Sequence, residues 1–324
     1  MKISQIRPDH LVKLARVAYE KDIAFYLVNQ DRFVVRVCPA CALQNDETYF
    51  EKEGFEYSRC AGCGSVYMNP GPPEKLINKF YKNSKNYEFW AEFMYPQSKA
   101  ERLLTIHKER ADWVVSNLRK RFPNQNQFVI LELGAGTGDS LATIAKIGGQ
   151  DFIGFAIEPN QSMQSYLREN GIQVIQESAL EAAKFKHKFD AVVSFEVLEH
   201  LLKPGLYLSL FARTLKKNGL FFATTPNANS IEIQLLQENS TSIDIEHISV
   251  LTPAGMQALA LLNGYRVEEI ITPGEFDIEL IREVYAKFSI NISENSTPED
   301  SQSLIQACGF SSHMRCILSL KKSR

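Results

Sequence analysis

Apolar and polar positions in the middle of the chain alternate between strand-like and helix-like patterns. Five short segments rich in apolar residues predict buried strands: 128–133, 152–157, 173–176, 189–195 and 220–225. Helical patterns follow three of them, beginning near Ser140, Gln161 and Pro204. Strands that alternate with helices form parallel sheets with helices on both faces. The pattern therefore predicts an α/β fold whose doubly wound sheet is mostly parallel.

Further elements flank this alternation. A helix is expected over 9–29, with Leu11 and Leu14 on its apolar face, and residues 216–219 should end the helix that starts at Pro204. The other expected elements are a strand at 33–37, helices over 74–121 and 253–262, a closing antiparallel pair at 265–271 and 314–320, and a mobile polar excursion at 291–303.

A glycine-rich turn joins the first predicted strand of the sheet to its helix. Gly134, Gly136 and Gly138 stand at alternate positions, and Glu132 precedes them. Glycine allows the backbone to approach a ligand that a Cβ would exclude. A carboxylate at this place disfavours a pyrophosphate and suits a cationic or hydroxyl-bearing cofactor.

A second acid, Glu158, ends the next strand. An acid at that position is the usual partner of a ribose diol. Ligands of open parallel sheets bind at the carboxyl ends of the strands. The other predicted strand ends contribute Ser178, Ala179 and Phe195 as candidate cofactor-binding residues.

Two Cys-x-x-Cys pairs predict a metal site. They are Cys38 with Cys41 and Cys60 with Cys63, and the spacing lies within the zinc-ribbon range. Four thiolates close a tetrahedral site, so the zinc would be structural. Disulfides, disfavoured without a secretion signal, and redox dithiols are the alternatives.

Two clusters of acids and histidines are candidate acid–base groups. Glu196, Glu199 and His200 follow the fourth strand of the sheet, but the zinc-protease pattern H-E-x-x-H is absent, which disfavours a metal there. His200 is then a candidate general acid or base, or a structural histidine. Glu246 and His247 form a second carboxylate–imidazole pair just before the helix at Pro253.

Composition narrows the function class. The 324 residues are 44% hydrophobic and 23% charged, with a net charge of −2. This length suffices for one α/β domain and a smaller appendage. No apolar run approaches the length of a membrane span, and the start lacks a signal-peptide core, so a cytoplasmic location is expected. The near-neutral charge disfavours a nucleic-acid partner.

The E-x-G-x-G-x-G turn followed by Glu158 resembles class I S-adenosylmethionine-dependent methyltransferases, whose fold is Rossmann-like, and differs from the dinucleotide pattern G-x-G-x-x-G. The cysteine pairs followed by Tyr67-x-Asn69-Pro70, and the later motifs 195–201, 225–227, 246–247, 272–274 and 311–314, are similar to zinc-ribbon methyltransferases that include sugar-nucleotide C-methyltransferases. The resemblance runs from about Cys38 to the C-terminus.

This resemblance implies roles for individual residues. His247 matches a base that Glu246 assists, while His200 and a tyrosine after the zinc module line the same site. Tyr81 and Tyr87 are both candidates for that tyrosine, and Tyr87 is preferred. The cofactor would be S-adenosyl-L-methionine, with a structural Zn²⁺. The stretch between Asn227 and Asp244 differs from the sugar enzymes, so the substrate stays open.

The expected organisation is an extension at 1–37, a zinc ribbon at 38–73, a helical connector at 74–124 and a methyltransferase domain at 125–324 with a substrate-side excursion. The expected activity is base-assisted C- or O-methylation of a small molecule, a sugar nucleotide or a related metabolite. One alternative is an rRNA or tRNA methyltransferase whose zinc ribbon binds RNA, although the ribbon is rich in acids. Another is a non-catalytic, cofactor-binding regulatory protein.

Overall fold

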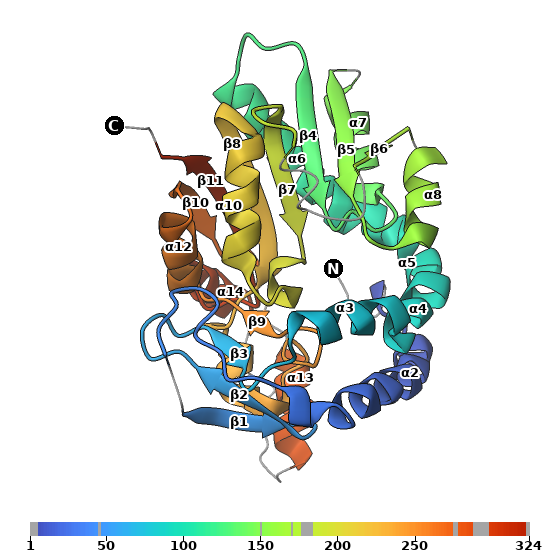
Figure 1. Ribbon diagram of the computed structural model, residues 1–324, viewed down its shortest axis with the longest axis vertical. Coiled ribbons are helices and arrows are strands. Elements are labelled where there is room, and N and C mark those ends of the chain that lie inside the picture. The colour runs from blue at the N-terminus through green and yellow to red at the C-terminus, as the bar shows by residue number, and fades with distance from the viewer. Residues whose placement is uncertain are drawn as a thin grey trace. The chain divides into compact units, whose positions relative to one another are not determined.

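The computed structural model describes residues 6–44, 47–149, 151–169, 171–175, 184–274, 278–287 and 298–321. Its contacts group the chain into two compact units. Unit 1 comprises Met1–Val34 and Pro72–Ala191, and unit 2 comprises Val35–Gly71 and Val192–Arg324. Figure 1 labels the elements of both units.

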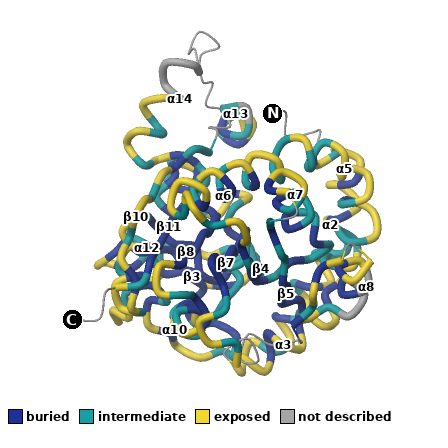
Figure 2. Tube along the Cα trace, turned by 90° about the horizontal axis from the view of Figure 1, so that it is seen from above, coloured by how far each residue is buried: buried dark blue, intermediate teal, exposed yellow. Residues whose placement is uncertain are grey.

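The strands of unit 1 form the parallel arrangement that the sequence predicts. β4 (Phe128–Leu133) pairs in parallel with β5 (Phe152–Ile157), and β5 pairs in parallel with the short β6 (Gln173–Val174). The residues of β4 and β5 are mostly buried, as Figure 2 shows. The helices α7 (Asp139–Gly148) and α8 (Gln161–Glu169) follow β4 and β5 along the chain. The strand–helix alternation is therefore confirmed.

The other elements described in unit 1 are helices. They are α2 (Asp9–Leu27), η1 (Gln30–Arg32), α3 (Glu74–Asn83), α4 (Lys85–Phe89), η2 (Trp90–Met94), α5 (Tyr95–Arg102), η3 (Leu103–His107) and α6 (Lys108–Arg121). The carboxylate of Asp22 on α2 is buried and accepts hydrogen bonds from the Ser84 hydroxyl and from the backbone N–H groups of Lys85 and Asn86. It thereby caps the start of α4 and joins this helix to α2.

Two expectations for the N-terminal segment are wrong. On α2, Leu11 and Ala15 are buried but Leu14 is 55% exposed, because the buried positions of this helix, Leu11, Ala15, Asp22 and Tyr26, are spaced by four and seven residues and leave Leu14 off their face. Residues 33–37 form no strand. The Arg36 N–H donates to the side chain of Asn69 at 2.8 Å instead of to a neighbouring strand.

Unit 2 contains the antiparallel end of the large sheet. β8 (Leu215–Pro226) pairs with β11 (His313–Leu320), which pairs with β10 (Tyr265–Ile271), so the predicted closing pair is confirmed. β7 (Phe189–Phe195) is cut by the division between the units. α10 (Pro204–Thr214) ends close to the predicted position, and residues 216–219 belong to β8, which begins directly after the helix at Leu215.

The remaining helices of unit 2 are short. They are η4 (Leu198–His200), α11 (Ile231–Leu236), η5 (Gln237–Asn239), α12 (Pro253–Leu262), α13 (Ile278–Lys287) and α14 (Pro298–Ala307). The predicted excursion at 291–303 lies mostly outside the described residues; its last part belongs to α14. Among the helices that the structure describes, none is long and apolar enough to span a bilayer.

The cysteine-rich segment belongs to a second, smaller sheet in unit 2. Its strand order is β1 (Thr48–Lys52), β2 (Phe55–Arg59), β3 (Val66–Met68) and β9 (Ser249–Val250), all antiparallel. β9 comes from a segment about 180 residues further along the chain, so this sheet joins the cysteine segment to the residues that follow His247. The four-part division of the chain stays a prediction.

Candidate functional site

The glycine turn after β4 has the backbone conformation that glycine permits. The φ angles of Gly134, Gly136 and Gly138 are +67°, +53° and +79°, a region that other residues rarely adopt. A Cβ on Gly138 would lie 2.4 Å from Cδ2 of Leu167, whereas a Cβ on Gly136 would meet nothing within 4 Å. Gly138 is therefore needed for packing, and the backbone at Gly136 faces open space.

Glu158, which directly follows β5, reaches this turn. Its carboxylate is buried and accepts hydrogen bonds from the Gly136 N–H and the Asn160 N–H, both at 2.8 Å. Burial raises the pKa of Glu158, and these two N–H groups oppose the rise. The acid is thus fixed against the backbone of the turn at the position where Gly136 faces open space.

Glu132 supplies the second carboxylate of the turn. It is buried, and its Oε2 has no hydrogen-bond partner among the described residues. Burial raises the pKa of Glu132 to about 8, a rise that Arg110 and the Ser140 hydroxyl moderate. A buried acceptor without a partner fits a ligand that brings a donor, such as an ammonium or hydroxyl group. The acceptor groups of the turn therefore fit the predicted cofactor, which carries an ammonium group and ribose hydroxyls.

His107, which no sequence motif indicated, contacts the side chain of Ser140. Its Nδ1 is 3.0 Å from the Ser140 hydroxyl, at the start of α7. Burial and the charge of Arg110 lower the pKa of His107 to about 4, so the imidazole is neutral near pH 7. His107 ends the π-helical segment η3, and such irregular turns in a helix often occur at functional sites.

The sequence also predicts Ser178, Ala179 and Phe195 as cofactor-binding residues. Ser178 and Ala179 lie outside the described residues. Phe195 is the last residue of β7, is buried, and belongs to unit 2.

Unit 2 brings the two predicted histidines together. The rings of His200 and His247 have centroids 4.7 Å apart. Nδ1 of His200 is 3.1 Å from the backbone oxygen of Glu246, and Nδ1 of His247 is 3.1 Å from that of Ser242. A carbonyl oxygen only accepts, so each neutral imidazole carries its proton on Nδ1 and has an acceptor nitrogen at Nε2.

The carboxylate that contacts His247 is Asp244, which sequence analysis did not select. Its Oδ2 is 3.4 Å from Nδ1 of His247, and its Oδ1 accepts from the N–H groups of Glu246 and His247, each at 2.8 Å. Burial alone would raise the pKa of Asp244, but His247 and these N–H groups lower it. Because its side chain accepts from the N–H groups two and three residues on, Asp244 forms an Asx turn, for which aspartate is one of the preferred residue types.

The buried environment controls the charge of His200. Burial first, and then the neighbouring His247, lower the pKa of His200 to about 3, so this imidazole is neutral at physiological pH. Glu199 beside it has no exposed surface and accepts a hydrogen bond from the Thr225 hydroxyl at 2.9 Å. Glu199, His200 and His247 offer ligand atoms that all lie within 4.8 Å of one another.

Another acid–imidazole pair, Glu196 with His313, lies near the carboxyl ends of β7 and β8. Glu196 has a φ of +55°, its carboxylate accepts from the Thr224 hydroxyl, and its Oε2 is 3.2 Å from Nε2 of His313. The side chain of His313 is 45% exposed. This pair is more open to solvent than the cluster around His247.

The four predicted zinc ligands converge. Sγ of Cys38 is 3.6 Å from that of Cys63, and Sγ of Cys41 is 3.4 Å from that of Cys60. With Zn–S bonds of about 2.3 Å, a tetrahedral site sets the sulfur atoms roughly 3.8 Å apart. The four cysteines therefore have nearly the spacing that a Cys₄ zinc site requires.

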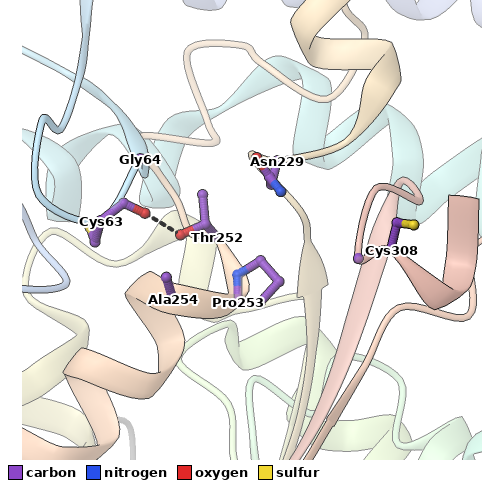
Figure 3. Close-up of a pocket in the computed structure, with 8 residues that line it drawn as sticks. Cys63, Gly64, Asn229, Thr252, Pro253, Ala254 and Cys308 are labelled. Atoms are coloured by element: carbon purple, nitrogen blue, oxygen red, sulfur yellow. Dashed lines mark hydrogen bonds between the residues drawn. The ribbon is translucent and has the colours of Figure 1, made fainter.

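The second cysteine knuckle contacts the start of α12. The Thr252 hydroxyl donates to the backbone oxygen of Cys63 and accepts from the Gly255 N–H, so Thr252 caps this helix. A pocket of about 260 Å³ opens beside the knuckle, and Figure 3 shows Cys308 and Asn229 on its wall. Cys308 is exposed.

Tyr87, the preferred site tyrosine, lies in α4. Its backbone N–H donates to the Ser84 hydroxyl at 3.0 Å, and its ring is partly buried. It belongs to unit 1, whereas His200, Glu246 and His247 belong to unit 2.

Methyltransferases are among the known proteins that are similar to this chain. A protein-family model described as methyltransferase domain matches residues 73–270. The ubiquinone biosynthesis O-methyltransferase of Azorhizobium caulinodans is 26% identical over 201 residues, which are 59% of this chain and 74% of that protein. The protein of the same name from Citrobacter koseri is 34% identical over 104 residues, 31% of this chain and 43% of that protein.

Among solved structures, magnesium protoporphyrin IX methyltransferase of Synechocystis PCC 6803 with bound SAH aligns with a TM-score of 0.49. The sequence identity is 14%, and the alignment covers 76% of this chain and 100% of that one.

Proposed function

The chain belongs to the methyltransferase domain family and is an S-adenosylmethionine-dependent enzyme, and from this premise we propose that its methyl acceptor is a small molecule, a sugar nucleotide or a related metabolite. The relatives above are named as O-methyltransferases of ubiquinone biosynthesis, which supports a small acceptor and transfer to oxygen. Transfer to carbon stays part of the proposal, as in the sugar-nucleotide enzymes that the sequence resembles.

The turn after β4 is proposed to hold the cofactor. Glu132, with its unpartnered oxygen, would accept from an ammonium or hydroxyl group, and Glu158 would accept from the ribose diol. Gly134, Gly136 and Gly138 let the backbone come close to it. The cofactor supplies an activated methyl group on a sulfonium, so the protein has to orient the acceptor and exclude water.

The observation that carries the catalytic proposal is the orientation of the two imidazoles. Carbonyl oxygens hold Nδ1 of His200 and of His247, and the acceptor nitrogen of each ring is Nε2. His247, supported by Asp244, would take the proton from the acceptor hydroxyl or from a carbon beside a ketone. His200 would hold the developing oxyanion or the acceptor, and Glu246 would line the acceptor site.

The four cysteines are proposed to hold a structural Zn²⁺. Their sulfur atoms all lie within 4.8 Å of one another, which supports the proposal, and four thiolates leave no open coordination position. Thiolate coordination would stabilise the two knuckles and the small sheet between β1 and β9. No step of the reaction is assigned to this ion.

The test of the acceptor is incubation with methyl-labelled S-adenosylmethionine and a panel of nucleotide sugars, quinols and RNA. We expect label in a nucleotide sugar or a quinol. Label only in RNA would refute the small-molecule proposal and favour an RNA methyltransferase.

Once the acceptor is identified, the variant His247→Gln tests the proposed base. It should lower turnover at least 100-fold and leave cofactor affinity unchanged, with His10→Gln on the exposed face of α2 as the control. Unchanged turnover in His247→Gln would refute its role as base.

A further inference from the structure

We propose that Glu199, His200 and His247 form a binding site for a divalent transition-metal cation such as Zn²⁺, separate from the four cysteines. Their ligand atoms lie within 4.8 Å of one another, although His247 is far from the other two in sequence. The cation site stands on this geometry alone. Its consequence for turnover rests on the proposed function.

The donor set suits such a cation. Two imidazole nitrogens and a carboxylate oxygen are common ligands of Zn²⁺ and of neighbouring first-row metals. At Zn–N and Zn–O distances of about 2.0–2.2 Å, tetrahedral ligand atoms lie roughly 3.4 Å apart, so the side chains need only close inward from their present spacing. Three protein ligands leave a fourth position for water or an acceptor oxygen.

The hydrogen-bond partners of these three side chains are of the kind that orients metal ligands in proteins. Histidines that bind metals usually donate their other N–H to a carbonyl or carboxylate, and binding carboxylates are themselves hydrogen-bonded. Nδ1 of His200 faces the Glu246 carbonyl, and Nδ1 of His247 faces the Ser242 carbonyl and Asp244. The Thr225 hydroxyl donates to Glu199. Each of the three side chains is therefore oriented by a separate partner.

Charge favours a cation at the same place. Glu199 is completely buried, and Asp244 adds a second carboxylate behind His247. A divalent cation bound between Glu199 and the two rings would lie close to both of these carboxyl groups.

The pair of Glu196 and His313 provides a matched comparison. It has one carboxylate and one imidazole 3.2 Å apart, and the imidazole is 45% exposed. It does not appear among the groups of three or more candidate ligands in the described part of the chain. His313→Gln therefore removes an imidazole beside a carboxylate without removing a proposed ligand.

Occupancy by a cation excludes proton transfer. A lone pair on Nε2 of His247 that is donated to a metal cannot accept a proton from the methyl acceptor. If the proposed function holds, a bound cation stops turnover, and a chelator that removes it restores turnover.

The experiment starts from full-length protein with one equivalent of Zn²⁺ on the cysteines, followed by titration with Zn²⁺ and, separately, Co²⁺. Calorimetry and elemental analysis should detect one further equivalent per chain. The Co²⁺ form should show d–d absorption without additional thiolate-to-cobalt charge transfer, because the new ligands are nitrogen and oxygen. Glu199→Gln and His247→Gln should weaken this second equivalent at least 100-fold, and Thr225→Val should weaken it about 10–100-fold. His313→Gln should bind like the wild type.

The outcomes separate the two proposals. A protein that binds only the cysteine-held equivalent, or that keeps the second one in both Glu199→Gln and His247→Gln, overturns the cation site. Thermal unfolding of each variant shows whether it is folded, and Thr225→Val keeps all three ligands in case a ligand variant does not fold. Inhibition by the second equivalent supports both proposals. Binding accompanied by higher turnover upholds the cation site and overturns the role of His247 as proton acceptor.

Discussion

Alanine at Gly136 and at Gly138 should have different effects, because the two glycines serve different purposes. A left-handed backbone costs a non-glycine residue about 1–2 kcal/mol, and both positions have positive φ. At Gly138 the new Cβ would also lie 2.4 Å from Cδ2 of Leu167 and 2.7 Å from Cδ1 of Ile172. Overpacking of this kind adds about 1–3 kcal/mol. Gly138→Ala should therefore lower the free energy of unfolding by roughly 2–5 kcal/mol.

Gly136→Ala has open space around its Cβ and should lower the free energy of unfolding by only about 1–2 kcal/mol. Its methyl group would occupy the space that the backbone faces, so affinity for S-adenosylhomocysteine should fall at least tenfold, which is about 1.4 kcal/mol. Gly264→Ala is the control, since it also has positive φ, at +84°, and nothing within 4 Å. It should lose stability like Gly136→Ala and keep cofactor affinity.

Urea denaturation measures the free energy of unfolding of these variants, and titration calorimetry measures their affinity for S-adenosylhomocysteine. A Gly138→Ala protein no less stable than Gly264→Ala would show that Leu167 and Ile172 yield without cost. A Gly136→Ala protein with wild-type affinity would show that the cofactor does not approach this backbone.

Three further predictions follow from the site. Burial raises the pKa of Glu132 to about 8 from 4.5, so the folded protein holds a proton that the unfolded chain releases. Its stability should fall as the pH rises from 5 to 8, by up to about 1.4 kcal/mol per pH unit; Glu132→Gln should flatten this slope in urea unfolding, and an unchanged slope would contradict the assignment. Asp244→Asn places an amide donor beside Nδ1 of His247, so turnover should fall on the order of 10–100-fold with unchanged cofactor affinity; full turnover in steady-state assays would show that Asp244 does not set the tautomer. Cys41→Ser should reduce the zinc content of purified protein, measured by elemental analysis, and wild-type zinc content would exclude a four-thiolate site.

Local spacing predicted the features that depend on one or two adjacent elements. The strand–helix alternation of β4, α7, β5 and α8 follows from apolar periods within each segment, and the structure confirms it. Glu158 reaches Gly136 because parallel neighbouring strands place their carboxyl ends at one edge of the sheet. The Cys-x-x-Cys spacing predicted the four cysteines as one group, although the contacts of Cys38 with Cys63 and of Cys41 with Cys60 that bring the two pairs together join different turns.

Residues 33–37 show where local patterns do not suffice. Their apolar and β-branched composition favours a strand, but Arg36 is buried and donates through its guanidinium to the backbone oxygens of Met68 and Ile248. These partners are 32 and 212 residues away along the chain. A local pattern does not contain contacts of that range.

From the sequence alone came the methyltransferase fold, the glycine turn with its two acids, and the set of candidate histidines, because these depend on residue types at short, fixed spacings. Only the tertiary structure decided how the histidines are used. It placed Asp244 against His247, turned both Nδ1 atoms toward carbonyl oxygens, and brought Glu199 to a histidine 48 residues further on. The physical reason is that backbone periodicity sets geometry within one element, whereas the contacts between η4 and the loop before β9 exist only after the chain has packed.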